Sequence, residues 1–230
     1  MADTMADGAK LAVDIGGTFT DVVVEWAGQQ KSIKVLTTTQ APEEGVLEGV
    51  RTVLAAADLS PSSVELAIHG TTLATNALIE RKGAKTALIT TDGFRDSIEI
   101  AYEHRFDQYD LYMERPPTLT PRHLRYGVPE RMASDGSVLV DLDEAALKAL
   151  IPVLKQEKVE SLAICFLHSY VNADHERRAR EILAAALPDT PITLSSDVCP
   201  EIREYDRMST TCANAYVQPL MAGYLQRLAD

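Results

Sequence analysis

Three strand-like segments in immediate succession constrain the fold more than any other feature of the sequence. They are joined by short turns that contain glycine, and they cover residues 11–15, 21–26 and 31–37. Segments rich in β-branched side chains and joined by turns this tight pair as antiparallel neighbours. The sequence therefore predicts a sheet that begins with three antiparallel strands.

Beyond these segments, apolar strands alternate with amphipathic helices. Helical periodicity covers residues 42–58, 143–158, 172–187 and 204–228, and apolar strand segments cover residues 64–68, 85–90, 159–167 and 191–195. The strand, helix and strand between residues 64 and 90 predict a parallel pair. Pro152 is expected to kink or split one helix and Pro219 to interrupt the last one. The fold class is α/β, with a mixed sheet and helices on both faces.

Composition and charge restrict the function classes. Of 230 residues 46% are hydrophobic and 24% charged, which is typical of a folded globular chain. With 22 basic and 34 acidic residues the net charge is −12, so the sequence lacks the basic footprint expected for nucleic acid or an anionic membrane surface. Residues 1–10 resemble no signal peptide and are expected to be disordered. Three cysteines without metal-ligand spacing indicate buried free thiols, and a cytoplasmic location is expected.

A glycine turn between the first two strands carries the first candidate site. Asp14 ends the first strand, and Gly16, Gly17, Thr18, Phe19 and Thr20 follow before Asp21. Glycines allow an anion to approach consecutive backbone N–H groups, and a carboxylate at the strand end suits a magnesium ion held through water. The alternative is an ordinary glycine hairpin with an exposed aspartate.

The second candidate segment lies where the strand at residues 64–68 gives way to a helix. It contains His69, Thr71, Thr72 and Asn76, whose polar groups could orient a carbonyl or a phosphate. The alternative is that a threonine caps the helix while His69 is a satisfied core histidine. Further along, His104 and Arg105 lie in a long aromatic and proline-bearing segment, for which a protein interface is favoured over a substrate contact.

The glycine turn, in its strand context, resembles the first phosphate motif of the sugar kinase, Hsp70 and actin superfamily. Residues 13–24, 69–83, 90–96 and 201–205 together resemble the hydantoinase A and 5-oxoprolinase family. The resemblance implies half of an actin-like ATPase fold, of the ribonuclease H-like kind. It places the N-terminal domain of the family at residues 11–203 and the start of the following domain at residues 204–230.

The resemblance also implies an activity and a set of roles. Members of this family use ATP to activate a lactam carbonyl by phosphorylation, with a small cyclic amide as substrate. The phosphates would be bound by Gly16, Gly17, Thr18, Phe19 and Thr20. The catalytic group would be Thr71, Thr72, Asn76 and His69. Mg²⁺ would be held by Asp14, with Asp21 either a second ligand or part of the hairpin.

The sequence contains one phosphate hairpin and no second glycine-rich partner, so it predicts half of an active site, inactive alone. The resemblance implies missing C-terminal domains and a hydantoinase B-type subunit as partners, and it leaves homo-oligomerisation and the identity of the substrate open. One alternative is the ATP-binding part of an acetone or acetophenone carboxylase. Another is a non-catalytic assembly module of the same fold.

Overall fold

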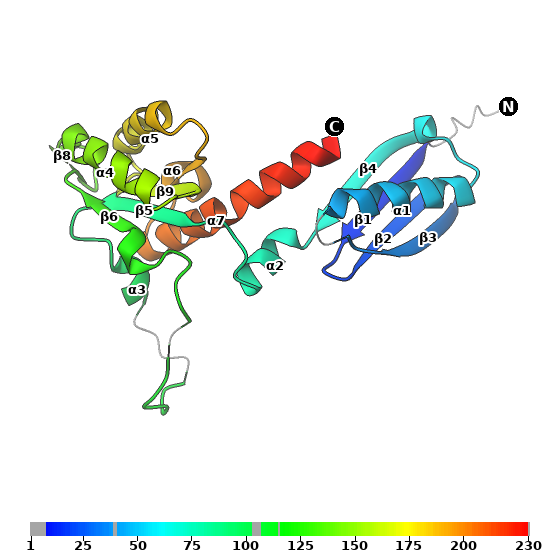
Figure 1. Cartoon of the computed structure of the whole chain (residues 1–230), viewed down its shortest axis with the longest axis horizontal. Helices are drawn as coiled ribbons and strands as arrows, with labels where there is room; N and C mark the ends of the chain where they lie inside the picture. The colour runs from blue at the N-terminus through cyan, green and yellow to red at the C-terminus, as the bar shows by residue number, and fades with distance from the viewer. Residues whose placement is uncertain (1–7, 39–40, 103–106, 115, 230) are drawn as a thin grey trace. The chain divides into compact units, whose positions relative to one another are not determined.

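The computed structural model describes residues 8–38, 41–102, 107–114 and 116–229. The chain divides into two compact units, shown in Figure 1. Residues 1–82 and 220–230 form the N-terminal unit, and residues 83–219 form the inserted unit. Of residues 1–10, which were expected to be disordered, residues 1–7 lie outside the described residues, but Ala9 and Lys10 belong to the first strand, so the prediction is wrong for these two. The predicted domain boundary at residues 203 and 204 stays a prediction.

The N-terminal unit is built on a four-stranded sheet of order β3-β2-β1-β4. Its strands are β1 (Ala9–Ile15), β2 (Phe19–Trp26), β3 (Gln29–Leu36) and β4 (Val64–Thr71). β1 pairs antiparallel with β2, and β2 with β3, whereas β4 runs parallel to β1. The predicted antiparallel start is therefore confirmed. The unit also contains α1 (Pro42–Ala56), the 3₁₀ turn Pro61–Ser63 and α2 (Leu73–Ile79).

Alternation along β1 decides where the core of this unit lies. Every second residue from Ala9 to Ile15 is buried, and these side chains meet the apolar face of α1. Tyr224, near the end of the chain, completes the same cluster and is 1% exposed. On the opposite face of the sheet, Leu66 and Ile68 of β4 are exposed. α1 and Tyr224 thus cover one face of the sheet.

The inserted unit contains a fully parallel sheet of order β10-β9-β5-β6. Its strands are β5 (Thr86–Thr91), β6 (Arg125–Val128), β9 (Ser161–Cys165) and β10 (Ile192–Leu194), and β7 (Arg131–Met132) and β8 (Val138–Val140) form a separate hairpin. The helices are α3 (Ser97–Ile100), the 3₁₀ turn Arg122–Leu124, α4 (Glu144–Gln156), α5 (Asp174–Ala186) and α6 (Ser195–Val198). The last helix, α7 (Glu204–Ala229), begins in this unit.

The central strand β9 lies between helices that cover both faces of this sheet. All five of its residues are buried, as expected for a strand with helices on both faces. Leu162 and Ile164 pack in the cluster that contains α4 and α5, whereas Ala163 and Cys165 pack against α7. The prediction of an α/β fold with a mixed sheet and helices on both faces is confirmed, with the two sheets contributing different parts of it.

Two local predictions are wrong. β4 and β5 do not pair, because each belongs to a different sheet. A crossover helix must pack back on its sheet to join two parallel strands, but α2 has only 7 residues and buries a single one. The predicted splitting at Pro152 and interruption at Pro219 are also wrong, because α4 continues through Pro152 and α7 through Pro219, whereas a kink at Pro152 stays a prediction. Each proline removes one backbone hydrogen bond, yet buried side chains before and after it hold the helix in place.

Other predictions agree with the structure. The Asp135 and Gly136 turn joins β7 to β8, and the Asp143 carboxylate caps α4 by accepting the Ala146 amide at 2.9 Å. Within the described part of the chain, the helices are all too short or too polar to cross a membrane.

Candidate functional site

The glycine turn between β1 and β2 is closed by its own backbone. The Gly16 amide donates to the Phe19 carbonyl at 2.9 Å, which leaves Gly17 and Thr18 at the tip. Within the described residues, the amides of Gly17 and Thr18 donate to no protein acceptor. Adjacent backbone N–H groups that lack an internal acceptor are the usual donors for a phosphate group.

Thr37, just after β3, fixes the other side of this turn. Its hydroxyl donates to the Gly16 carbonyl at 3.0 Å, and its amide donates to the Thr18 carbonyl at 2.9 Å. The Thr20 hydroxyl, which is fully buried, lies 3.0 Å from the same hydroxyl. In this structure Thr20 therefore supports the turn from inside. Sequence reasoning missed Thr37, because a threonine that follows a strand carries no distinctive spacing.

The second candidate segment is attached directly to the end of β1. The Thr72 amide and hydroxyl both donate to the Ile15 carbonyl, at 3.0 and 3.1 Å. The Asn76 side chain donates to the Thr72 hydroxyl at 3.2 Å, and a Cβ on Gly17 would lie 3.3 Å from that same amide nitrogen. The glycine turn and the first turn of α2 thus form one site, although they are more than fifty residues apart in sequence.

Asp14 and Asp21, the two predicted metal ligands, lie opposite each other. Asp14 and Asp21 are cross-strand partners in β1 and β2, so both side chains project from the same face of the sheet. Asp21 forms an ion pair with Lys34 at 3.0 Å, whereas Asp14 is exposed at the strand end. Two carboxylates facing each other repel, and the Lys34 ammonium or a divalent cation offsets that repulsion.

Gly70 leaves space for the Asp14 carboxylate beside β4. A Cβ on this residue would lie 3.3 Å from Asp14 Oδ1, so the absence of a side chain lets the carboxylate rest against β4. Mg²⁺ usually keeps several waters and takes one or two protein carboxylates. Asp14, with Asp21 across the strand pair, fits that requirement. No cluster of three or more His, Cys, Asp or Glu side chains suited to a metal occurs among the described residues.

His69 lies on the other side of the sheet from the carboxylates. Its register partner in β1 is Val13, whose side chain faces the core, whereas Asp14 is paired with Gly70. The His69 ring is hydrogen-bonded through Nε2 to the Tyr224 hydroxyl at 2.7 Å. Partial burial lowers the pKa of His69, and the nearby Asp14 charge opposes that shift. Tyr224 was not a candidate in the sequence, because it lies on the last helix, far from either motif.

Thr71 and Phe19 occupy the edge of the site. The Thr71 hydroxyl accepts the Leu73 amide at 3.1 Å, so this threonine satisfies a donor at the start of α2. Phe19 is 43% exposed, and the Lys34 ammonium lies 5.2 Å from its ring centroid. His104 and Arg105 lie outside the described residues.

A mixed sheet that starts with three antiparallel strands and continues with a parallel one, with a glycine turn at its first hairpin, defines one half of an actin-like ATPase fold. The model of the hydantoinase/oxoprolinase N-terminal region matches residues 10–187, and the chain belongs to this family. The family resemblance drawn from the motifs is confirmed.

Three similar proteins define the relationship further. The alpha subunit of caprolactamase from Pseudomonas jessenii is 40% identical over 228 residues, which are 95% of this chain and 32% of that protein. The crystal structure of the ATP-dependent caprolactamase from the same organism superposes with a TM-score of 0.87 at 39% identity, covering 96% of this chain and 33% of that one. The acetophenone carboxylase gamma subunit of Aromatoleum aromaticum is 31% identical over 92% of this chain and 31% of its own length.

A nucleotide-free structure of acetone carboxylase has a TM-score of 0.88 at 26% identity, over 98% of this chain and 34% of that one. The chain therefore spans about a third of the length of these relatives. It corresponds to their N-terminal region.

Proposed function

We propose that this chain is the N-terminal, phosphate-binding region of an ATP-dependent cyclic amide hydrolase. One observation carries the proposal: the glycine turn and the first turn of α2 converge on the end of β1, with the amides of Gly17 and Thr18 unused. The similarity to caprolactamase supports an amide substrate.

In this proposal each residue has a defined task. The Gly17 and Thr18 amides, with the Thr18 hydroxyl, bind phosphate oxygens, and Gly16 gives the turn its shape. The Asp14 carboxylate orients Mg²⁺ through water, with Asp21 supporting it from β2. Thr72 and Asn76 position the turn, while Phe19 and Thr20 hold its base. ATP, when bound, supplies the phosphoryl group that turns the amide oxygen into a better leaving group.

His69 and Thr71, which were predicted to belong to the catalytic group, have a smaller role in this proposal. The His69 ring is directed to Tyr224, and the Thr71 hydroxyl is used at the start of α2. We propose that both position the second segment rather than contact the amide. The amide itself would bind with the help of C-terminal domains and a hydantoinase B-type subunit, so the chain alone is expected to bind nucleotide without turnover.

The test is a titration of the chain with Mg-ATP by calorimetry. Asp14→Ala is expected to reduce the affinity at least roughly ten-fold, because the metal loses its protein carboxylate. Glu25→Gln is the matched control, since Glu25 is an exposed acidic residue on β2 at the other end of the strand pair. An Asp14→Ala chain that binds Mg-ATP as tightly as the parent would contradict the proposal.

A second candidate function is favoured by the similarity to the acetophenone and acetone carboxylases. In that case the same phosphate site would serve the activation of a ketone for carboxylation. The two functions differ in the substrate that stimulates ATP hydrolysis by the full-length protein with its partner subunit. Stimulation by a lactam supports the hydrolase, and stimulation by a ketone with bicarbonate supports the carboxylase.

A further inference from the structure

Two sequence motifs that the phosphate site leaves unused meet in the inserted unit. The segment at residues 94–102 and the segment at residues 203–205 together line a cavity of about 260 Å³. Residues 203–205 belong to a stretch that carries the family resemblance, at residues 201–205, and the first segment begins inside another, at residues 90–96. Segments separated by a hundred residues thus line one small open cavity.

The cavity contains two opposite charges that are not paired with each other. Arg203 and Glu204 both line it, and within the described residues neither takes part in an ion pair. Adjacent opposite charges at a protein surface usually pair with a neighbour or with solvent counter-ions. Two that line the same cavity unpaired provide one partner for a carboxylate and one for an ammonium group.

The other residues that line the cavity are mostly apolar, which suits contact with a short hydrocarbon chain. Phe94, Ile100 and Tyr205 supply apolar surface, and Ser97 supplies a hydroxyl. Tyr102 stands edge-on to Tyr205 with ring centroids 5.1 Å apart, and its hydroxyl is hydrogen-bonded to Asp206.

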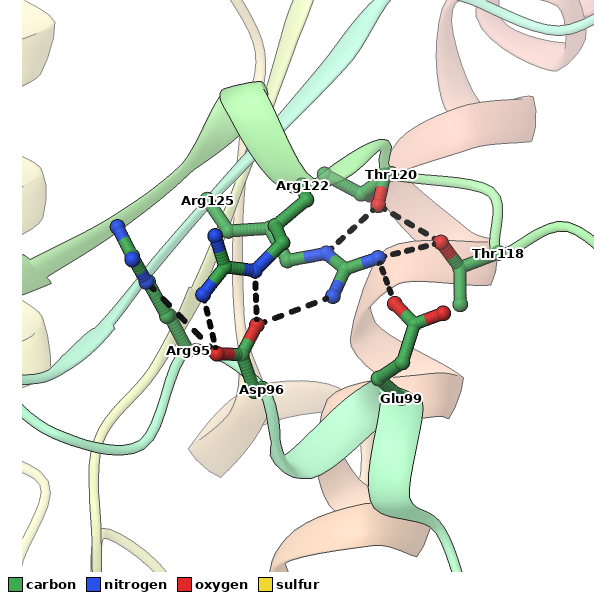
Figure 2. A network of polar contacts seen from close by, with 7 residues as sticks. All are labelled: Arg95, Asp96, Glu99, Thr118, Thr120, Arg122 and Arg125. Atoms are coloured by element: carbon green, nitrogen blue, oxygen red, sulfur yellow. Dashed lines mark hydrogen bonds and ion pairs between the residues drawn. The ribbon is translucent and has the colours of Figure 1, made fainter.

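The first wall of the cavity, α3, is held from behind by the network in Figure 2. Arg122 binds the Asp96 carboxylate through two hydrogen bonds of 2.9 and 2.8 Å, just before α3 begins. Arg125, whose side chain is 2% exposed, donates to Glu99 at 2.6 Å and to the Thr120 carbonyl at 2.9 Å. The wall is therefore fixed before any ligand arrives.

The second wall is held by the fully buried Arg207. Its guanidinium donates to the Glu201 carbonyl at 3.2 Å and to the Phe166 carbonyl at 2.8 Å, and its amide donates to the Arg203 carbonyl. Arg203 itself has a φ of +90°, a conformation that non-glycine residues rarely adopt. Such conformations persist only where the surroundings enforce them, and they concentrate at ligand sites.

From this geometry we propose that the cavity binds a small amino acid in its zwitterionic form. Arg203 pairs with the carboxylate, Glu204 pairs with the ammonium group, and the apolar side chains contact the carbon chain between them. Opening a cyclic amide with water breaks the ring C–N bond and forms a C–O bond, which leaves a carboxylate and an amine on one molecule. The inference rests on the proposed hydrolase function for the source of the amino acid.

The experiment measures binding of a matched series of probes to the chain without nucleotide, by calorimetry. The probes are 6-aminohexanoate and glutamate as zwitterions, hexanoate with only the carboxylate, and hexylamine with only the ammonium group. We expect a zwitterion to bind at least roughly ten-fold more tightly than either singly charged probe, because each charge adds a pairing. Hexanoate or hexylamine binding as tightly as both zwitterions, or no binding of either zwitterion, would overturn the proposal.

Two variants locate the site. Arg203→Gln should remove the advantage of 6-aminohexanoate over hexylamine, and Glu204→Gln should remove its advantage over hexanoate. Arg51→Gln and Glu48→Gln are the matched controls, because both residues are exposed on α1 in the other unit. Unchanged selectivity in both cavity variants would also overturn the proposal, and the probe series on the parent chain keeps the test valid if a variant fails to fold.

The two binding experiments distinguish failure of the cavity proposal from failure of the proposed function. Mg-ATP binding that depends on Asp14, without any amino acid binding, removes the cavity proposal and leaves the phosphate site intact. Amino acid binding with the expected selectivity, without Mg-ATP binding, supports the cavity and contradicts the proposed function.

Discussion

His69 and Tyr224, separated by 155 positions in the sequence, are joined by a hydrogen bond of 2.7 Å in the N-terminal unit. Burial, and then the Glu43 charge, raise the pKa of Tyr224 to about 12, so its hydroxyl stays protonated at neutral pH. Because a hydroxyl can donate or accept, the tautomer of the His69 ring decides which group donates in this hydrogen bond.

A pH dependence of stability follows from this pair. The pKa of His69 is lower in the folded chain than its ordinary value of 6.5, so the unfolded chain binds more protons as the pH falls through that value. The free energy of unfolding should therefore decrease on acidification from about pH 7.5 to about pH 5.5. In His69→Gln this part of the decrease should be absent. Chemical denaturation at several pH values measures it, with His123→Gln, an exposed histidine in the inserted unit, as the control.

Thr72 and Thr71 should respond differently to loss of the hydroxyl. Thr72→Val removes the bonds to the Ile15 carbonyl and from Asn76, and should cost about 1 kcal/mol of stability. Thr71→Val removes the acceptor for the Leu73 amide and should cost a similar ~1 kcal/mol. Only Thr72→Val should also weaken Mg-ATP binding several-fold, because that hydroxyl fixes α2 to the end of β1. Equal losses of nucleotide affinity in both variants would contradict this assignment.

Gly17 should tolerate alanine structurally while losing ligand affinity. The new Cβ would meet only the Asn76 amide, at 3.3 Å, and small adjustments accommodate that contact. We expect stability to change by less than ~1 kcal/mol, since alanine also restricts the unfolded chain. Mg-ATP affinity should fall several-fold, because the methyl group lies at the turn tip. Gly28→Ala is the contrast: its φ of +74° makes alanine destabilising by ~1 kcal/mol, with nucleotide binding unchanged.

Replacement of Arg125 should lower stability far more than replacement of Arg122, although both arginines form an ion pair with Asp96 (Figure 2). Replacing the buried Arg125 with methionine removes the guanidinium that donates to the Thr120 carbonyl, the Thr118 hydroxyl and Glu99, at a cost of about 2 to 4 kcal/mol. Arg122→Met breaks an exposed ion pair with Asp96 and should cost less than ~1 kcal/mol. Thermal denaturation distinguishes the two, and similar melting temperatures would refute the difference.

The three cysteines should differ in reactivity. Burial raises the pKa of Cys165 to about 12 and that of Cys212 to about 11, and neither thiol reaches solvent. Cys199 is only partly buried. A thiol reagent at mildly alkaline pH should therefore modify Cys199 alone in the native chain, and all three in denaturant. Rapid native modification of Cys165 would show that the inserted unit opens around β9.

Local patterns predicted the first sheet well. The alternation along β1 and β2 and the short glycine turn between them leave few other pairings for residues 9–26. The Asp143 cap and the Asp135 and Gly136 hairpin are equally local. In each case the signal and the structure it specifies lie within a few residues of each other.

The errors concern long-range partners. Nothing in the strand, helix and strand between residues 64 and 90 indicates that β4 and β5 separate into different sheets. The site shows the same limit: the glycine turn and the Thr72 segment were candidates, but the bonds from Thr37 and Tyr224 were not. The cavity between residues 94–102 and 203–205 could not be predicted either, because two motifs reveal their shared cavity only once the backbone brings them together.

The division of the chain has a consequence for its synthesis. Residues 83–219 are complete in themselves, whereas the N-terminal unit receives Tyr224 and its neighbours only from residues 220–230. As a ribosome produces the chain, the first sheet emerges early and lacks part of its core until the final turns of α7 appear. The inserted unit can therefore fold first, and the N-terminal unit, with its phosphate site, is completed only after the inserted unit has been synthesised.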